Sequence, residues 1–557
     1  MKFLRFATVI FTIASLHWPA SVSALDKAPS LFAGQIAPLL EGMGQHEFAI
    51  DTEQPMAQAY FNQAVALTYG FNHLEAGRSF RQVAELEPNL PMAYWGQALV
   101  LGPNINGAME ADSVAPALAA IESAMERLEY ASAKERDLIM ALASRYSSDE
   151  TMADRQTLDA AYADAMLKVA TKYPSDPNVM TLLAESLMVI HAWDYWHSDG
   201  RPKEWTPQIL EILTQGLSEH PRHAGLIHYY IHAVEASKSP EAAEAYADTL
   251  RDLVPGAGHL VHMPSHIYLR VGRYQDGVIA NEKAMQVDDN YIAQCKAQGV
   301  YPVAYVPHNR HFLWAMATMQ GSSAKAISAA EHMASHIDTE LMLEPGLGTL
   351  QHYWVTPLYA YVRFGQWQKI FAAQKPNLDL KYPLGIWHYA RGVAFVASNQ
   401  LDRARLELSV LQTLAADDDL KDVTVWDIND AQSIVSIAAL VLEGEIEGKA
   451  GHYARSIEMF EAAIAMEDAL NYDEPSDWHY PVRQSLGAVL IDAGDYQRAA
   501  AVYRQDLQTF PNNGWSLLGL YQALQKQGAE KEAAQVKAKF DASWQWADIT
   551  IRQSRIL

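Results

Sequence analysis

The chain has 557 residues, half of them hydrophobic, and carries 42 lysines and arginines against 66 aspartates and glutamates, for a net charge of −24. A chain this long exceeds one compact core, so we expect the fold to grow by repetition. A surface this acidic repels nucleic acid and anionic lipid, which excludes both as partners. The one cysteine, Cys295, excludes internal disulfides, cysteine-rich zinc sites and iron–sulfur clusters.

Residues 1–24 predict a secretory signal peptide. Lys2 and Arg5 give it a positive start, residues 6–16 form an apolar run, and small residues then offer a cleavage site. The apolar run is too short for a transmembrane helix, although an uncleaved anchor is the alternative. We therefore expect a periplasmic or secreted protein with no membrane insertion after signal cleavage, in which residues 25–56 form an N-terminal extension.

A helical hairpin repeat with a period of about 34 residues follows. Trp515, Leu518 and Gly519 match the W-x2-L-G start of a repeat's first helix, although Gln522 replaces the tyrosine expected three residues later. Further matches are Ala76, Phe80 and Pro88; Gly444, Ser456, Phe460 and Ala463; and Gly487, Tyr496, Ala499, Tyr503 and Pro511. Over most of residues 57–540 the chain resembles the tetratricopeptide repeat (TPR) family. The resemblance implies a right-handed superhelix with a concave groove.

The expected fold is therefore all-α, an α-solenoid (TPR superhelix) of stacked helical hairpins with irregular inserts. We expect residues 57–350 to form a TPR region with a histidine-rich groove and residues 351–557 to form a C-terminal TPR region. Residues 191–206, 288–307 and 466–481 interrupt the repeat with aromatic-rich segments. Long inserts in a compact scaffold are often functional; the alternative is that they only cover the ends or edges of the superhelix.

Three stretches of the chain place histidines three and four residues apart, which puts their side chains on one face of a helix. Counted from the small residues and prolines of each repeat, these side chains take positions 2, 5, 9 and 12 of a first helix. The set is His228, His232 and Glu235; His259, His262 and His266; His308 and His311; and His352 in the next unit. These positions face the groove in the TPR family, so the resemblance implies that four adjacent units aim imidazoles into one channel.

Imidazole is the commonest transition-metal ligand at neutral pH, and packed helices lie about 8–10 Å apart, so adjacent units can share an ion. We predict a divalent transition metal, either zinc, iron or copper, bound as one ion or as a dinuclear centre. The predicted ligands are His228, His232, Glu235, His259, His262, His266, His308 and His311. Glu235 is expected to be a ligand or the catalytic general base that activates water. The alternatives are hydrogen-bonded core histidines or a groove for a peptide or small anion.

Three further features qualify this prediction. Pro264 lies inside the proposed histidine helix, where it either kinks the helix or stands in its first turn. Asp194 and Asp199 could orient a ligand imidazole by accepting its second N–H. Asn72 and Asn106 lie in turns that could approach the groove, although turn chemistry and capping explain them as well.

Several motifs carry a further resemblance, to exported bacterial TPR-domain proteins of unassigned activity, which implies the scaffold and no reaction. They are Phe71-Asn-His-Leu-Glu-Ala, Leu101-Gly-Pro-Asn-Ile-Asn, His228-Tyr-Tyr-Ile-His-Ala-Val-Glu-Ala-Ser, Gly256-Ala-Gly-His-Leu-Val-His-Met-Pro-Ser-His and Pro307-His-Asn-Arg-His-Phe-Leu. Two functions stay open. The first is a metal-dependent hydrolase or oxidase of a small organic substrate. The second is a non-catalytic periplasmic scaffold that binds a peptide, a partner protein or a metal ion in its groove.

Overall fold

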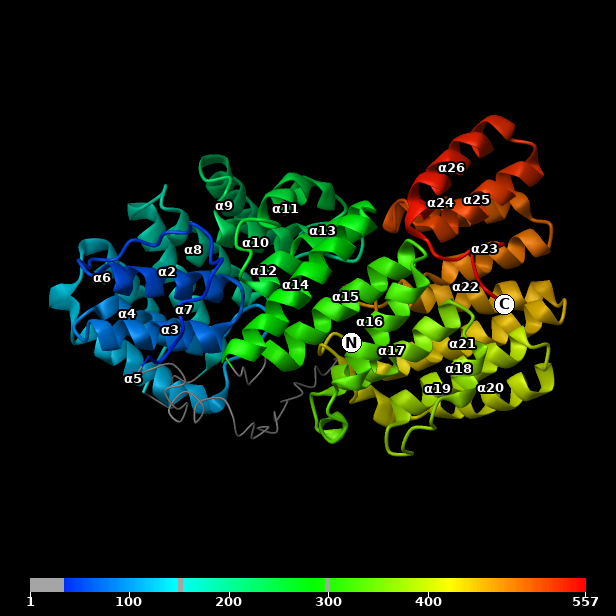
Figure 1. Cartoon of the computed structure of the whole chain (residues 1–557), viewed down its shortest axis with the longest axis horizontal. Coiled ribbons are helices and arrows are strands. Elements are labelled where there is room, and N and C mark those ends of the chain that lie inside the picture. The colour runs from blue at the N-terminus through cyan, green and yellow to red at the C-terminus, as the bar shows by residue number, and fades with distance from the viewer. Residues whose placement is uncertain (1–34, 149–153, 296–300) are drawn as a thin grey trace, which may run out of the picture.

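The computed structural model describes residues 35–148, 154–295 and 301–557 (Figure 1). Within these ranges the fold is all-α, as predicted, and successive helices stack side by side along the long axis of the molecule. The expected signal peptide lies outside the described residues. No helix in the described ranges combines the length and the apolar character needed to cross a membrane.

The first part of the chain builds the helices that precede and include the histidine-bearing elements. They are α2 (Pro55–Tyr69), α3 (His73–Leu86), α4 (Pro91–Leu101), η1 (Ala111–Ser113), α5 (Val114–Met125), η2 (Leu128–Tyr130), α6 (Ala133–Ala143), α7 (Arg155–Lys172), α8 (Pro177–Ile190), α9 (Thr206–Glu219), α10 (Ala224–Val234), η4 (Pro240–Ala243), α11 (Glu244–Leu250), α12 (Gly258–His262) and α13 (Pro264–Val271). Proline opens several of them because its missing N–H costs nothing in a first turn.

The second part continues the stack to the C-terminus. Its elements are α14 (Tyr274–Cys295), the π-helical turn η5 (Tyr301–Tyr305), α15 (Val306–Met319), α16 (Ser323–Ser335), η6 (Leu341–Leu343), α17 (Gly348–Arg363), α18 (Trp367–Ala372), α19 (Lys381–Ala397), α20 (Leu401–Ala415), η7 (Asp418–Lys421), β1 (Thr424–Val425), β2 (Asn429–Asp430), α21 (Ala431–Lys449), α22 (Tyr453–Glu467), α23 (Val482–Asp492), α24 (Tyr496–Thr509), α25 (Gly514–Gln527), α26 (Glu530–Ser543) and η8 (Trp544–Trp546). The antiparallel hairpin of β1 and β2 was not expected from the sequence.

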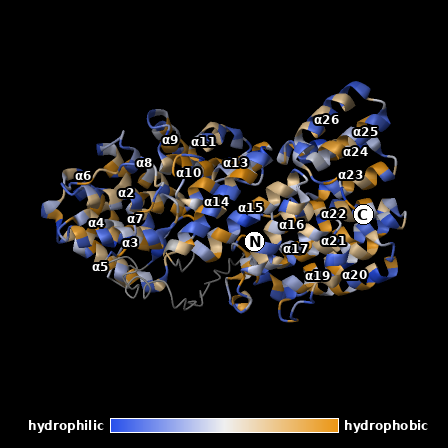
Figure 2. Ribbon diagram, in the orientation of Figure 1, coloured by the Kyte–Doolittle hydropathy of each residue, from blue (hydrophilic) through white to orange (hydrophobic). Residues whose placement is uncertain are grey.

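Small residues allow the paired helices to approach closely. An added Cβ on Gly96 would lie 2.3 Å from the Phe80 ring, and added Cβ atoms on Gly487 and Gly519 would lie 2.4 and 2.1 Å from the Tyr503 ring. These glycines therefore form the holes that receive a large side chain of a neighbouring helix. Figure 2 shows hydrophobic and hydrophilic residues mixed around most helices, as expected where each helix buries one side against its neighbours.

The inserts are only partly as expected. Residues 191–205 and 468–481 are irregular, but the segment at 288–307 is not an insert at its start, because α14 runs as a helix through Cys295. This helix has 22 residues and so extends into the segment that was expected to be irregular. The expectation of an irregular start at residue 288 was therefore wrong.

The C-terminal units pack back onto the middle of the chain. The Trp515 indole N–H donates to the carbonyl oxygen of Thr318 at 2.9 Å, and the Tyr274 hydroxyl donates to the carbonyl oxygen of Pro511 at 2.8 Å. These contacts join α14 and α15 to α25 and the turn before it. Segments from both parts of the chain therefore meet around the histidine-bearing helices.

Candidate metal centre

Three segments carry the histidines that meet at the centre. They are helix α10, the consecutive helices α12 and α13, and the start of helix α15. His228 and His232 lie four residues apart on α10, so their rings project from one face. His262 and His266 also lie four residues apart, on either side of Met263, whose φ of −49° and ψ of −36° keep the backbone helical. Pro264 therefore stands in the first turn of α13, and the shared face of α12 and α13 continues past it.

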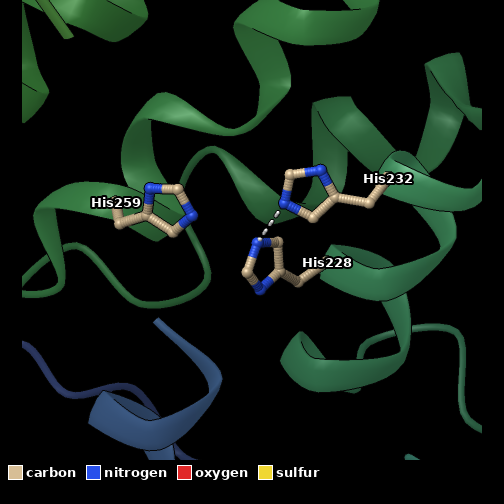
Figure 3. A group of neighbouring side chains, drawn as sticks. All are labelled: His228, His232 and His259. Carbon is tan, nitrogen blue, oxygen red and sulfur yellow. Dashed lines mark hydrogen bonds between the residues drawn. The ribbon is translucent and has the colours of Figure 1, made fainter. Parts of the chain in front are cut away.

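The first trio consists of His228, His232 and His259 (Figure 3). The Nε2 atoms of His228 and His232 lie 3.0 Å apart, and the His259 ring centroid is 5.0 Å from that of His228. Figure 3 shows the three rings turned toward one point, with His228 and His232 coming from one helix and His259 from another. All three side chains are buried, and one ring nitrogen from each lies within 4.8 Å of the others.

The hydrogen bonds of the Nδ1 atoms of His228 and His232 determine which nitrogen of each ring carries no proton. His228 Nδ1 donates to the carbonyl oxygen of Tyr69 at 2.5 Å, and His232 Nδ1 donates to Glu235 Oε1 at 2.9 Å. Burial lowers the pKa of both rings, so each is neutral and its Nε2 carries a lone pair. Two lone pairs at 3.0 Å repel each other, and a cation between them removes that repulsion.

The second trio, His262, His266 and His308, repeats the arrangement one unit further along the chain. The Nε2 atoms of His262 and His266 also lie 3.0 Å apart. His262 Nδ1 donates to Asn281 Oδ1 at 2.7 Å, and the amide of Asn281 is oriented by its own bond to the carbonyl oxygen of Gly277. A close Nε2 pair, held by acceptors on the far side of each ring, therefore occurs in both trios.

Glu235 joins the two trios. Its Oε1 accepts from His232 of the first trio, and its Oε2 lies 2.7 Å from His266 Nδ1 of the second. Glu474, from the irregular segment after α22, places its Oε2 3.1 Å from the same His266 nitrogen. Burial opposes ionisation of Glu235, but the neighbouring His266 and His232 outweigh it and lower the pKa of Glu235 to about 2.

The two carboxylates also act on the ring between them. Burial alone would lower the pKa of His266, yet Glu235 and Glu474 raise it to about 9. The two carboxylates therefore favour a second proton on the His266 ring in the metal-free chain. Metal binding there must displace this proton.

A phenylalanine ring packs against each trio. Phe71, which follows α2, lies with its ring centroid 4.7 Å from His228 and 5.2 Å from His259. Phe312 on α15 lies 4.4 Å from His266 and 4.9 Å from His308. These rings fix the orientations of the imidazoles and keep the surroundings apolar, so the unpaired nitrogens face each other without competing donors.

A cavity of about 120 Å³ opens onto both trios. Its walls include His232 and His259 of the first trio, His266 and His308 of the second, and the carboxylates Glu235 and Glu474. A small molecule in this cavity would therefore face both trios at once. Of the turns considered from the sequence, the one holding Asn106 reaches the cavity, where its side-chain amide donates to the Tyr305 hydroxyl at 3.2 Å.

The donor set fits divalent transition metals. Both ring nitrogens of His259, and Nδ1 of His308, are buried without a hydrogen-bond partner. Unpaired buried polar atoms are rare in proteins, and here they converge beside bare imidazole nitrogens. Three imidazoles with one open side suit zinc, copper or iron, and in the second trio the ion replaces the additional proton of His266.

Two groups of residues lie elsewhere than predicted. His311 lies outside both trios, stacked on Trp314 at 5.1 Å and facing His352 at 5.2 Å. Asp194 pairs with Lys203, and Asp199 pairs with Arg201, both at the surface and away from the ligand rings. The oxygens that orient the rings come instead from Tyr69, Asn281, Glu235 and Glu474. Of these residues, only Glu235 could be predicted from the sequence, because it lies three residues after His232 and therefore on the same face of the helix.

No protein-family model matches the chain, and no curated protein matches it. Among solved structures it is similar to the human IFIT1 dimer with m7Gppp-AAAA, at 12% identity and a TM-score of 0.31 over 88% of this chain and 90% of that chain. It is also similar to yeast Tom70, at 11% identity and a TM-score of 0.27 over 87% and 90% of the two chains. The structure of Naa15/Naa10 bound to HypK-THB is also similar, at 13% identity and a TM-score of 0.23 over 87% of this chain and 70% of that chain.

These similarities are distant and concern tetratricopeptide-repeat proteins. The chain is a helical repeat protein. A likeness of this degree is confined to the helical repeat and says nothing about function.

Proposed function

We propose that this protein is an exported metalloprotein that holds one divalent transition-metal ion in each trio and uses the pair on a small organic substrate. One observation carries the proposal: two successive repeat units build the same three-histidine arrangement, buried in the first trio and with only His308 half-buried in the second, and both open onto one cavity. Isolated core histidines would satisfy both ring nitrogens. Here the Nδ1 atoms of both HxxxH pairs are held by oxygens, while the Nε2 atoms of each pair face one another.

A divalent ion in such a site supplies a Lewis acid that polarises a substrate oxygen or lowers the pKa of a water. His228, His232 and His259 would hold one ion, and His262, His266 and His308 the other. Zinc would support a hydrolysis, in which water is the second reactant, and iron or copper would instead support oxidation of the substrate with dioxygen as the electron acceptor.

The carboxylates have different tasks. Both oxygens of Glu235 lie against ligand rings, so we assign it as a positioning residue instead of the general base expected from the sequence. Glu474 touches only His266 among the ligands and also lines the cavity. Burial raises the pKa of its carboxyl, which suits a group that exchanges a proton with a substrate near neutral pH.

The localisation and partners belong to the same proposal. The first 24 residues support export to the periplasm or beyond, where the mature chain would act without membrane insertion. The acidic sequence opposes binding of nucleic acid. The small volume of the cavity favours a small molecule over a peptide as the occupant.

The test is metal stoichiometry, measured by elemental analysis of mature protein purified from the periplasm. We expect two ions per chain in the natural protein, one in His228→Ala, one in His262→Ala, and none in the double variant. His332→Ala is the matched control, because His332 and His336 form another i, i+4 pair on the exposed surface of α16. Its metal content should equal that of the natural protein.

Circular dichroism must show that each variant keeps its helices. Metal that stays bound in the folded double variant, or is lost equally in the His332→Ala control, would contradict the proposal. Metal-free natural protein that captures a peptide or partner protein would establish the non-catalytic scaffold instead.

A further inference from the structure

Aromatic side chains form the walls of the cavity that the two trios share. Trp193, Tyr305, Trp426 and Tyr472 all line it. The Trp193 ring meets His232 edge-on, at 5.2 Å and 85°, and the Trp426 ring meets His308 edge-on, at 5.8 Å and 89°. One tryptophan therefore stands beside each trio, on either side of the same space.

Both tryptophans are held by unusual backbone. Trp193 has a φ of 60° and Trp426 a φ of 52°, which is the left-handed region that bulky residues seldom adopt. Trp193 belongs to the irregular segment after α8, and Trp426 belongs to the turn between β1 and β2. Backbone outliers of this kind concentrate at ligand and active sites. Two non-repeat segments thus each deliver one indole to the cavity.

The charges around the cavity select against ionic ligands. Glu235, Asp473 and Glu474 line it, whereas no lysine or arginine of the described ranges does. The guanidinium of Arg270 lies over the Tyr472 ring at 5.3 Å, and its donors are taken by the carbonyl oxygens of Glu235 and Ser237. The three carboxylates offset most of the positive charge that ions in the two trios would bring, so the cavity offers neither an anion nor an ammonium a strong excess of opposite charge.

The size of the cavity limits the ligand to one ring. Its volume of about 120 Å³ is close to the roughly 150 Å³ of an apolar protein cavity that admits benzene. A neutral hydroxyl carries a lone pair for a metal ion and no charge of its own. We propose that the ligand is a small phenol, whose ring lies between Trp193 and Trp426 and whose hydroxyl faces the two trios. This inference rests on the proposed metal centre and adds the substrate class to it.

Binding of 4-methylphenol to the full-length mature protein loaded with cobalt tests the inference. Calorimetry gives the affinity, and visible absorption of the cobalt reports a change among its ligands. We expect 4-methylphenol to bind at least about 10-fold more tightly than benzylamine, benzoate or inorganic phosphate. N-acetyl-tyrosinamide carries the same ring on a larger body and should bind more weakly than 4-methylphenol.

Trp193→Leu and Trp426→Leu should each weaken 4-methylphenol binding about 10-fold while the cobalt content stays at two ions per chain. Trp546→Leu is the matched control, since Trp546 is 51% exposed and lies in η8 near the C-terminus. Equal affinity for the charged probes, tighter binding of N-acetyl-tyrosinamide, or unchanged affinity in both cavity variants would overturn the phenol assignment alone. Failure to load cobalt would overturn the metal centre, and the substrate class with it.

Discussion

A single carboxylate holds one ligand ring of each trio. Glu235 contacts His232 through one oxygen and His266 through the other, and it is 1% exposed. Because acceptors on the far nitrogen fix the tautomer and orientation of a ligand histidine, Glu235 helps to orient one ring in each trio. Glu474 contacts His266 but not the first trio.

Glu235→Gln should therefore weaken metal binding at both trios. The amide keeps the shape of the side chain but accepts through one atom only, so we expect a loss of about 10–100-fold in affinity at each site. Glu474→Gln is the matched variant and should weaken only the second trio. Titration with a competing chelator measures the two affinities separately. If Glu235→Gln affected one site alone, the bridging role of this residue would be wrong.

The sequence predicted all six histidines of the two trios as candidate ligands, because helical spacing is a local property. It pointed to the inserts that hold Trp193 and Glu474, but it could not predict that these residues or Trp426 reach the cavity, since no spacing fixes the path of an irregular segment. Asp194 and Asp199 were predicted to orient ligand rings on their nearness in sequence alone, and ion pairs with neighbouring cations hold them at the surface.

At the scale of the helix, both trios follow one rule. Positions 5 and 9 of one first helix supply the close Nε2 pair, and position 2 of the next first helix supplies the third ring. In the third unit His311 takes position 5 and His352 takes position 2 of the unit after, but Ala315 takes position 9. His311 was predicted as a ligand from its spacing to His308. The missing ring at Ala315 explains why it lies outside both trios.

Ala315→His should complete a third trio. Nε2 of His311 and Nε2 of His352 are buried without partners, and their ring centroids lie 5.2 Å apart. We expect the variant to bind three ions per chain, and Ala315→His combined with His311→Ala to bind two. Elemental analysis of folded protein gives the counts. Ala315→Asn controls for the larger side chain and should also bind two.

Asp288 on α14 ties together the helix starts that carry the third ring of each trio. Its Oδ1 accepts from the Tyr301 hydroxyl at 2.9 Å, and that hydroxyl accepts the backbone N–H of His259 at 3.1 Å. Its Oδ2 accepts from the Asn309 amide at 2.7 Å, next to His308. Burial raises the pKa of the Asp288 carboxyl to about 7.

A carboxyl with a raised pKa holds its proton more tightly in the folded than in the unfolded chain. Its contribution to the free energy of unfolding is therefore full below about pH 4 and is lost as the pH rises toward 7. An asparagine side chain cannot titrate, so Asp288→Asn should gain stability relative to the natural protein across this range. Urea denaturation between about pH 4 and pH 7 measures the difference. A difference that stays constant over the range would show that Asp288 does not titrate there.

At the scale of the molecule, the C-terminal helices contact helices in the middle of the chain. Gly272, at the end of α13, has a φ of 75°, and an added Cβ would lie 2.2 Å from the carbonyl oxygen of Pro511. The hydrogen bond from Trp515 to Thr318 lies in the same contact region. The helical repeat in the sequence predicted that the helices stack. The spacing of residues along one helix does not predict contacts between units that are about 200 residues apart in the sequence.

Gly272→Ala should therefore destabilise the chain more than its backbone conformation alone requires. Gly528 is the matched control, because its φ of 74° is nearly the same and nothing lies within 4 Å of an added Cβ. The left-handed backbone costs about 1–2 kcal/mol in either variant. The clash with Pro511 adds about 1–3 kcal/mol in Gly272→Ala. Equal urea midpoints in the two variants would show that the backbone near Pro511 accommodates the added methyl group without a loss of stability.

Each trio combines two histidines of one repeat unit with one histidine of the next unit. A new trio can therefore arise when a unit is duplicated. Tandem duplication of one hairpin with histidines at positions 2, 5 and 9 creates a complete coordination sphere at every new boundary, with no change in backbone geometry. The number of trios then increases with the number of copies, and a boundary that lacks one of the three histidines, as at Ala315, forms no complete trio while the other boundaries are unaffected.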